Sequence, residues 1–144
     1  MSLEFHIGTW AELGDAAYAI RYEVFVCEQG VPLEMERDEA DETSIHALAL
    51  KDGVPVATGR LLADGHIGRI AVVKAWRGAG VGRQLTQGLI EEARKRGFTE
   101  VVLHAQTSAE GFYNKLGFLP QGAVFMEAGI PHQQMALSLR SKPA

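Results

Sequence analysis

The chain has little cysteine and no long hydrophobic run. A single thiol, Cys27, stands among 144 residues, so the chain can form neither an internal disulfide nor a thiolate cage for zinc. No stretch approaches the roughly 20 apolar residues of a membrane-spanning helix. The first ten residues lack a basic start followed by an apolar segment, so we expect no secretory signal. These features predict a cytoplasmic protein without membrane contact.

Positive charge is also scarce. Fourteen Lys and Arg residues stand against eighteen Asp and Glu residues, a formal net charge of −4, whereas nucleic-acid-binding proteins favour the opposite balance. His6, His46 and His66 share no spacing typical of metal ligands, so we expect no metal site. With 47% hydrophobic and 22% charged residues the composition is that of a globular protein. The length suits one domain over residues 1–144 that handles small molecules or another protein.

The first part of the chain predicts a helix followed by an antiparallel meander. A capping box at residues 9–12 opens the helix, and Gly30 with Pro32 ends it. We expect the cysteine to pack in the apolar stripe of this helix, which consists of Leu13, Ala17, Ile20, Val24 and Cys27. Asp-Gly turns predict antiparallel pairing of the strands that follow, at residues 46–51, 54–62 and 67–73.

An acidic segment, residues 33–42, separates the helix from the meander. Six of its side chains are acidic and one is basic, and because such a density of charge resists burial, we expect a solvated loop. A second hypothesis for this segment is that its negative field attracts a cationic acceptor.

The second part of the chain predicts alternating helices and strands. A helix from Val81 ends at a glycine cap, Gly97, and a buried strand follows at 101–105. A second capping box at 107–110 opens a short helix, and two strands, 118–126 and 133–139, close the chain. Because a strand–helix–strand crossover makes its two strands parallel, the fold class is α+β. We expect a single mixed, largely antiparallel sheet flanked by helices.

The segment from Ile70 to Gly82 is the most informative, because it joins an apolar strand, a tight loop and a helix start. Its glycines remove side chains where backbone N–H groups converge at a helix N-terminus, which favours a phosphate. Arg77 adds a positive charge beside them. A Walker loop would need Lys-Ser or Lys-Thr after the last glycine, and a dinucleotide fingerprint would need a small residue where Arg83 stands. Both of these alternatives are excluded.

This segment resembles the GNAT superfamily of N-acetyltransferases. The family signature is Arg or Gln, two residues, Gly, one residue, and Gly or Ala, which Arg77, Gly80 and Gly82 match. The downstream sequence from Phe112 to Phe118 adds an aromatic-Tyr-x-x-x-Gly-Phe pattern, and the resemblance covers nearly the whole chain. The sequences VFVCEQGVP and EAGIPH resemble the ElaA-like bacterial branch. The resemblance implies the acyl-CoA N-acyltransferase fold.

The resemblance implies acetyl-coenzyme A as co-substrate, without a metal. The strand at Ile70, Ala71 and Val72 would pair with the pantetheine arm, next to a main-chain N–H that polarises the thioester carbonyl. Strands 67–73 and 101–105 would be parallel and would splay apart to admit the thioester. Gln106 stands where the family often has an Asn that contacts the cofactor. The loop would bind the pyrophosphate through Arg77, Gly78, Ala79, Gly80, Val81, Gly82 and Arg83.

Tyr113 matches the family's usual general acid, which protonates the leaving thiolate. A phenol with an ordinary pKa of about 10 is able to donate to a thiolate. The acceptor amine also needs a proton acceptor, and the sequence leaves four candidates open: Glu28, Glu127, His104 and His132. We favour Glu28 and His132 for catalysis, expect Gln29, Glu127 and His132 to bind the acceptor, and interpret His104 as a core histidine within a buried strand.

The function that this resemblance implies is an acetyl-coenzyme A-dependent N-acetyltransferase. It would transfer the acetyl group directly, in a ternary complex, to a primary amine of a small molecule or peptide. The alternative is a non-catalytic acyl-coenzyme A sensor or regulatory module. A third interpretation, an acyl-homoserine-lactone-synthase-like enzyme, is suggested by residues 21–25 and disfavoured by the intact loop and the short chain. Family habit also suggests a homodimer through the closing strands.

Overall fold

The structure, a computed structural model, describes residues 3–32 and 39–139. They form one seven-stranded sheet of order β1-β2-β3-β4-β5-β7-β6. Its neighbours are antiparallel except for β4 and β5, which are parallel. The predicted mixed, largely antiparallel sheet is therefore confirmed. The strands are β1 (Leu3–Gly8), β2 (Ile45–Lys51), β3 (Val54–Leu61), β4 (His66–Val72), β5 (Glu100–Gln106), β6 (Leu119–Glu127) and β7 (Ile130–Ser138).

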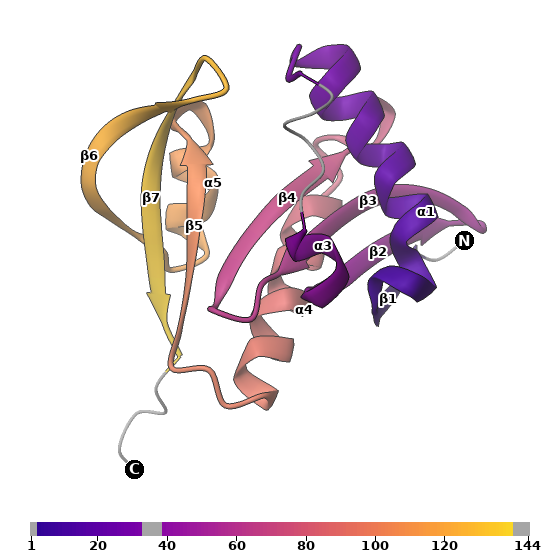
Figure 1. Cartoon of the computed structure of the whole chain (residues 1–144), viewed down its shortest axis with the longest axis horizontal. Helices are drawn as coiled ribbons and strands as arrows, with labels where there is room; N and C mark the ends of the chain where they lie inside the picture. The colour runs from indigo at the N-terminus through magenta and orange to yellow at the C-terminus, as the bar shows by residue number, and fades with distance from the viewer. Residues whose placement is uncertain (1–2, 33–38, 140–144) are drawn as a thin grey trace.

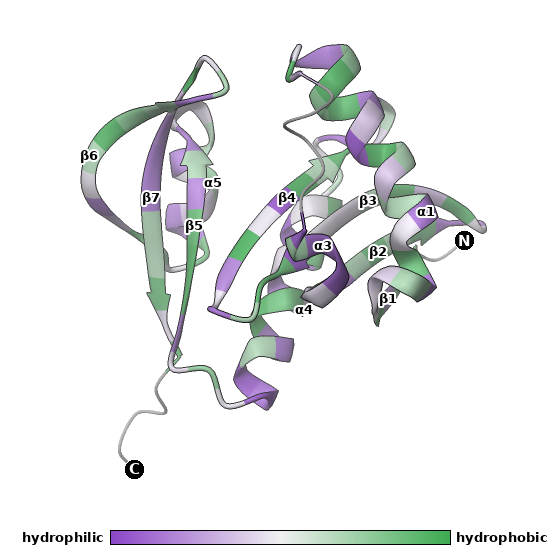
Figure 2. Cartoon of the chain, in the orientation of Figure 1, coloured by the Kyte–Doolittle hydropathy of each residue, from purple (hydrophilic) through white to green (hydrophobic). Residues whose placement is uncertain are grey.

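Helices cover both faces of this sheet (Figure 1). One face of the β2–β4 region packs against Ile20 of α1 and Val24 of η1, and the other packs against α4 through Leu85 and Leu89. Figure 2 shows hydrophilic and hydrophobic residues alternating along both helices, as expected of helices with one face on a core. The helical elements are α1 (Trp10–Arg21), η1 (Tyr22–Glu28), α3 (Ala40–Thr43), η2 (Lys74–Trp76), α4 (Val81–Lys95), η3 (Thr107–Ala109) and α5 (Glu110–Lys115).

Of the two predicted capping boxes, one forms. At α1 the Thr9 N–H donates to Glu12 Oε1 over 2.9 Å, and the Glu12 N–H donates to Thr9 Oγ1 over 3.3 Å. The box predicted at 107–110 is wrong. These residues form the 3₁₀ turn η3 directly after β5, and α5 starts after Ala109 without a side-chain cap. A capping box needs an extended residue with a side-chain acceptor at the N-cap position, and Ala109 has neither property.

The predicted apolar stripe of the first helix holds as far as Val24, which is buried. From Tyr22 the chain continues as the π-helix η1, whose Gln29 N–H donates to the Val24 carbonyl over 3.1 Å. A π turn holds more residues than an α turn, so the side chains that follow lie on a different face. Cys27 is therefore exposed, and the prediction that it packs in the stripe is wrong.

A solvated loop was expected at residues 33–42. Residues 33–38 of this segment lie outside the described residues. In the part that is described, the expectation is wrong. Residues Ala40–Thr43 form the short helix α3, and Asp41 is only 1% exposed. Its carboxylate accepts hydrogen bonds from Arg21 at 2.8 and 3.1 Å and from Arg60 at 2.8 Å. Paired guanidinium groups are what make the burial of a carboxylate tolerable.

The parallel strands β4 and β5 separate after a short contact. They pair at His66 with Val102 and at Ile67 with Leu103, and then diverge towards their C-terminal ends (Figure 1). A break in the register between β3 and β4 lies at this point, and Arg69 there has a positive φ of 52°. Such a bulge bends a strand away from its neighbour. The splay that the sequence resemblance implied is present in the fold.

Candidate functional site

The loop between β4 and α4 leaves backbone N–H groups open to a ligand. Gly78 and Gly80 both have a φ of +82°, and a Cβ added at either would meet no atom within 4 Å. Gly80 is the N-cap of α4 and has no side chain to satisfy the N–H groups of the first turn. These donors, together with the positive end of a 15-residue helix, favour a bound phosphate.

A cleft of about 560 Å³ opens over this loop. Its walls come from the backbone of β4, from the loop and from α5, where Phe112 and Lys115 face the space. Among the residues predicted for the cofactor, Ala79 and Gln106 do not line this cleft. Those that do are Ile70, Ala71, Val72, Arg77, Gly78, Gly80, Val81, Gly82 and Arg83.

Arg77, which the sequence assigned to the phosphate, forms an ion pair with Glu28 at the end of η1. Its guanidinium donates to the two carboxylate oxygens over 2.8 and 2.6 Å, and its Nε donates to the Val72 carbonyl over 2.9 Å. The hydrogen bonds from Arg77 lower the pKa of Glu28, and those with Glu28 raise the pKa of Arg77. A carboxylate with a lowered pKa is a weaker proton acceptor, which counts against Glu28 as the base.

Replacing Glu28 with Gln is expected to tighten the binding of coenzyme A, the ligand that the sequence resemblance implies, roughly two- to fivefold, the value of one exposed ion pair. The substitution removes the anion that competes with a phosphate for Arg77. Calorimetric titration with coenzyme A measures the effect, and Glu42→Gln, an exposed position on α3, is the control for the loss of one negative charge. Weaker binding by the Glu28 variant would show that this carboxylate does not compete with the ligand.

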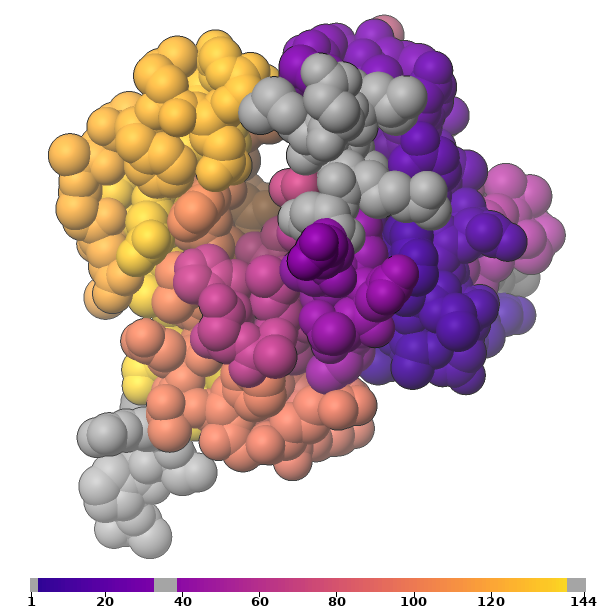
Figure 3. All heavy atoms as spheres, in the orientation of Figure 1, coloured from indigo at the N-terminus to yellow at the C-terminus, as the bar shows by residue number. Residues whose placement is uncertain are grey.

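A second cavity, of about 600 Å³, lies between the diverging β4 and β5. Figure 3 shows the surface hollowed between the C-terminal strands and the N-terminal helical segment. Gln29, Ile70 and Ala109 line both this cavity and the cleft over the loop, so the two spaces adjoin. At this junction the Gln106 side chain donates to Gln29 Oε1 over 3.0 Å. Gln106, which the sequence analysis assigned to the cofactor, therefore meets Gln29, which it assigned to the acceptor, where the two spaces join.

The strand register places the polar side chains of this cavity on one face of the sheet. In β5 the odd-numbered residues Val101, Leu103 and Ala105 are buried, whereas His104 is exposed. The expectation that His104 is a core histidine is therefore wrong. His104 instead lines the cavity that the separation of β4 from β5 leaves open.

Glu127 and His132 are brought to this face by the β6–β7 hairpin. Cα partners in an antiparallel pair share a face, and the register matches Gln106 with His132 and Glu127 with Ile130. The two residues at the hairpin turn, Ala128 and Gly129, have φ values of 52° and 77°. Positive φ at both positions is the requirement of a type I′ turn.

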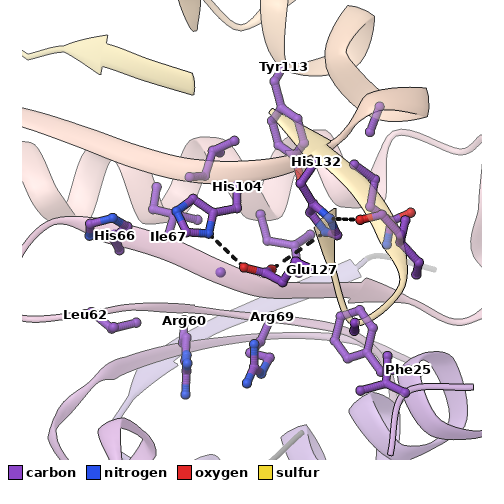
Figure 4. A pocket seen from close by; sticks show the side chains of 18 of the residues that line it. Phe25, Arg60, Leu62, His66, Ile67, Arg69, His104, Tyr113, Glu127 and His132 are labelled. Carbon is purple, nitrogen blue, oxygen red and sulfur yellow. Dashed lines mark hydrogen bonds and ion pairs between the residues drawn. The ribbon is translucent and has the colours of Figure 1, made fainter. Parts of the chain in front are cut away.

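Three of these side chains form a cluster (Figure 4). His104 Nδ1 lies 3.1 Å from Glu127 Oε1, and His132 Nε2 lies 3.7 Å from Glu127 Oε2. The other ring nitrogen of His132, Nδ1, is 2.7 Å from the Ile130 carbonyl. The rings of His66 and Phe125 stand edge-on to His104, with centroids at 5.7 and 5.1 Å. The cluster is able to accept a proton inside the cavity.

Tyr113 lines the same cavity from α5. Its ring packs edge-on against Phe112 and Phe118, with centroid distances of 5.0 and 6.0 Å. Burial raises the pKa of Tyr113 to about 12, so the phenol keeps its proton at every physiological pH. The side chain is therefore in the protonated form that a proton donor needs, although the raised pKa makes it a weaker acid than an ordinary tyrosine.

The structure thus gathers the predicted residues into two groups. The loop and β4 line the cleft, and Glu28 pairs with Arg77 at its wall. Lining the cavity are Tyr113, Gln29, Gln106, Glu127 and His132. His104 and His66 also line the cavity. The sequence analysis named His104 among four candidates for the proton acceptor but interpreted it as a core histidine, and it assigned His66 to no site. The available signal was the position of His104 in a strand whose alternate residues share one face.

Two searches of the described residues gave negative results. Over 3–32 and 39–139, no helix is both long and apolar enough to cross a membrane. In the same ranges no three His, Cys, Asp or Glu side chains are grouped so that they would hold a metal ion.

Comparison with known proteins identifies the family. Residues 12–139 match the family described as an acetyltransferase (GNAT) domain. The chain belongs to the GNAT acetyltransferase family. It is 42% identical over 128 residues to the uncharacterized N-acetyltransferase YjcF of Bacillus subtilis, a match that covers 86% of this chain and 91% of that protein. It is 35% identical to the ElaA protein of Escherichia coli, with 84% of each chain covered.

Solved structures of GNAT proteins agree with this assignment. The crystal structure of E. coli ElaA matches with a TM-score of 0.86 and 33% identity, over 95% of this chain and 100% of that chain. An acyl-CoA N-acyltransferase from Pseudomonas aeruginosa matches with the same TM-score, identity and coverage. The predicted ElaA-like resemblance and acyl-CoA N-acyltransferase fold are confirmed.

The acyl-homoserine lactone synthase BjaI also shares the architecture of this GNAT chain. Its TM-score is 0.80 at 17% identity, over 96% of this chain and 84% of that chain. At this identity the likeness shows a common fold and carries no argument for a common reaction.

Proposed function

We propose that the chain is an acetyl-coenzyme A-dependent N-acetyltransferase that acts on a primary amine of a small molecule or peptide. The observation that carries the proposal is the junction of the cleft and the cavity, where Gln29, Ile70 and Ala109 line both. Donor and acceptor bound on either side of this junction would be in contact. Direct transfer in a ternary complex needs this arrangement.

The residues around the cleft fit coenzyme A. The glycine loop presents main-chain N–H groups without side chains in front of them, and Arg77, Arg83 and Lys115 add positive charge along the walls. Pyrophosphate and phosphate groups favour such donors. The exposed backbone of β4 beside the splay would hold the pantetheine arm, with a main-chain N–H there to stabilise negative charge on the carbonyl oxygen. Acetyl-coenzyme A would supply the acetyl group as a reactive thioester.

The residues around the cavity would bind and activate the amine. Tyr113 would donate its proton to the departing thiolate, and the Glu127 cluster would face the amine. Glu28 and His132, the bases favoured from the sequence, differ in setting: Glu28 is paired with Arg77, whereas His132 belongs to the cluster. The exposed apolar side chains of Leu119, Val124 and Met126 support a homodimer as a further proposal.

A thiol-release assay with acetyl-coenzyme A tests the reaction over a panel of small amines, polyamines, amino acids and peptides. We expect turnover with at least one amine and stoichiometric binding of coenzyme A by calorimetry. Binding without turnover on any amine would instead favour the non-catalytic sensor. Absence of binding would overturn both functions.

Replacing Gly82 with Leu is expected to weaken the binding of coenzyme A about tenfold or more, a loss of roughly 1.4 kcal/mol or above. A Cβ at this position would lie 3.2 Å from the Val72 side chain and 4.0 Å from Phe112, so the added side chain would occupy the cleft. Gly88→Leu is the matched control, because it lies on the same helix, where a Cβ would meet no atom within 4 Å. Equal affinity in the two variants, measured by calorimetry, would place the donor elsewhere.

A further inference from the structure

We infer that His104 is the general base of the proposed acetyl transfer and that Glu127 positions it. The inference rests on the proposed function, and it replaces Glu28 and His132 in the role of base. Its starting point is the hydrogen-bond pattern of the cluster, which assigns a different role to each of the two histidines.

The contact with Glu127 fixes the tautomer of His104. An ionised carboxylate only accepts hydrogen bonds, so the ring nitrogen 3.1 Å from Glu127 Oε1, Nδ1, must carry the proton. In the neutral ring, Nε2 then has the free lone pair. A carboxylate that holds Nδ1–H also orients the imidazole and stabilises the imidazolium that forms when Nε2 accepts a proton. This arrangement is that of a general base.

His132 carries its proton on the same ring nitrogen but faces Glu127 with the other one. Its Nδ1 is 2.7 Å from the Ile130 carbonyl, and a carbonyl oxygen also only accepts, so Nδ1 carries the proton there. Its free nitrogen, Nε2, faces Glu127 Oε2 at 3.7 Å rather than the open cavity. The His132 side chain is 9% exposed, against 36% for His104. The ring of His104 is therefore the more accessible of the two to an amine in the cavity.

The surroundings of His104 contain a second histidine. His66, on β4, stands edge-on to it with a centroid distance of 5.7 Å and is itself held by Asp64 Oδ1 at 3.0 Å from its Nδ1. The charged and titratable groups near His104 include Glu127 and His132 from the β6–β7 hairpin, His66 from β4 and Asp64 from the turn before β4. Arg60, Arg69 and Tyr113 also line the cavity. Any measurement of pH dependence at His104 has to separate it from these neighbours.

The chemical step balances with groups that the cavity already contains. The amine nitrogen forms a bond to the carbonyl carbon of the thioester, and its proton passes to His104 Nε2. The carbon–sulfur bond then breaks, and the sulfur receives the proton of the Tyr113 hydroxyl. The imidazolium returns one proton to solvent and the phenolate takes one back. The sum is an amine and acetyl-coenzyme A giving an acetamide and coenzyme A.

The test uses His104→Ala in the whole chain, with the amine that the wild type acetylates fastest. We expect kcat/KM for the amine to fall roughly 100-fold at neutral pH, the usual contribution of a general base, while the affinity for coenzyme A stays unchanged. The residual rate should rise with pH as the amine loses its own proton, and added imidazole should restore part of the rate. His6→Ala is the matched control, because His6 also pairs with a carboxylate, Glu4 at 3.3 Å, but on the exposed strand β1.

Glu127→Gln tests the positioning role. The amide still accepts a hydrogen bond from Nδ1 but no longer stabilises an imidazolium, so we expect kcat to fall about tenfold with little change in KM, and the acid limb of the pH profile to move. If His104→Ala lost coenzyme A binding as well, His104→Gln would replace it as the variant that keeps a polar side chain.

The outcomes separate the inference from the proposed function. A wild type that binds coenzyme A but acetylates no amine overturns both. An active wild type with unchanged kinetics in His104→Ala, or with a loss that imidazole does not rescue, overturns the role of His104 and leaves the N-acetyltransferase intact.

Discussion

Replacing Tyr113 with Phe is expected to lower kcat roughly 100- to 1000-fold and to leave the affinity for coenzyme A unchanged. The phenol lines the cavity beside the junction with the donor cleft, and its removal leaves the thiolate to depart without a proton. The ring contacts with Phe112 and Phe118 are kept by phenylalanine, so the packing is preserved. Steady-state kinetics with saturating amine measure the loss, and Tyr22→Phe, an exposed tyrosine on η1, is the control.

The pH dependence gives an independent check on Tyr113. Burial raises its pKa to about 12, above the ordinary value of about 10. Between these values the folded chain holds the proton and the unfolded chain does not, so the free energy of unfolding falls as the pH rises through this range. In the Tyr113→Phe variant, this part of the decline in the free energy of unfolding should be absent.

If the Tyr113→Phe variant had the same kcat as the wild type, water rather than Tyr113 would be the group that protonates the thiolate.

Replacing Asp41 with Asn is expected to lower the free energy of unfolding by about 3–5 kcal/mol, the usual effect of breaking a buried ion pair. Arg21 and Asp41 are each 1% exposed and Arg60 is 5% exposed. One carboxylate pairs with two buried guanidinium groups. The asparagine would remove the charge of Asp41 from both pairs.

Urea denaturation measures this loss, and Asp15→Asn, an exposed position on α1, should change stability by less than about 0.5 kcal/mol. Burial raises the pKa of Asp41, but the hydrogen bonds and charges of Arg21 and Arg60 outweigh it and hold the pKa below its ordinary value. The stabilisation is therefore present above the unfolded pKa and is lost as the pH falls through the folded one. A loss below about 1 kcal/mol in the Asn variant would contradict a stabilising role for the cluster.

Local signals predicted much of the fold. The Asp-Gly turns predicted the meander, and the glycines from Gly78 to Gly82 predicted the loop and the start of α4. Both predictions succeed because they depend on residues close together in sequence. The strand β1 was missed although Leu3, Phe5 and Ile7 alternate in it. A single short run with period 2 is a weak signal until its partner, β2, is known.

The features that sequence analysis missed depend on distant pairing. Asp41 was expected in solvent because its partner Arg21 stands 20 residues away. The pairing of Glu28 with Arg77 spans 49 residues, and that of His104 with Glu127 spans 23. His104 also looked buried because its apolar neighbours suggested a strand covered on both faces. The separation of β4 from β5 uncovers one of those faces, and no local pattern encodes that separation.

The two-residue turn at Ala128 and Gly129 has a consequence for chemistry as well as for folding. Side chains of a strand alternate between its faces, so sliding β6 by one residue against β7 would carry Glu127 to the opposite side. The length of this turn therefore sets which carboxylate, if any, meets the imidazole at position 104. Homologues with one residue more or fewer at the turn would need another acid to hold that ring.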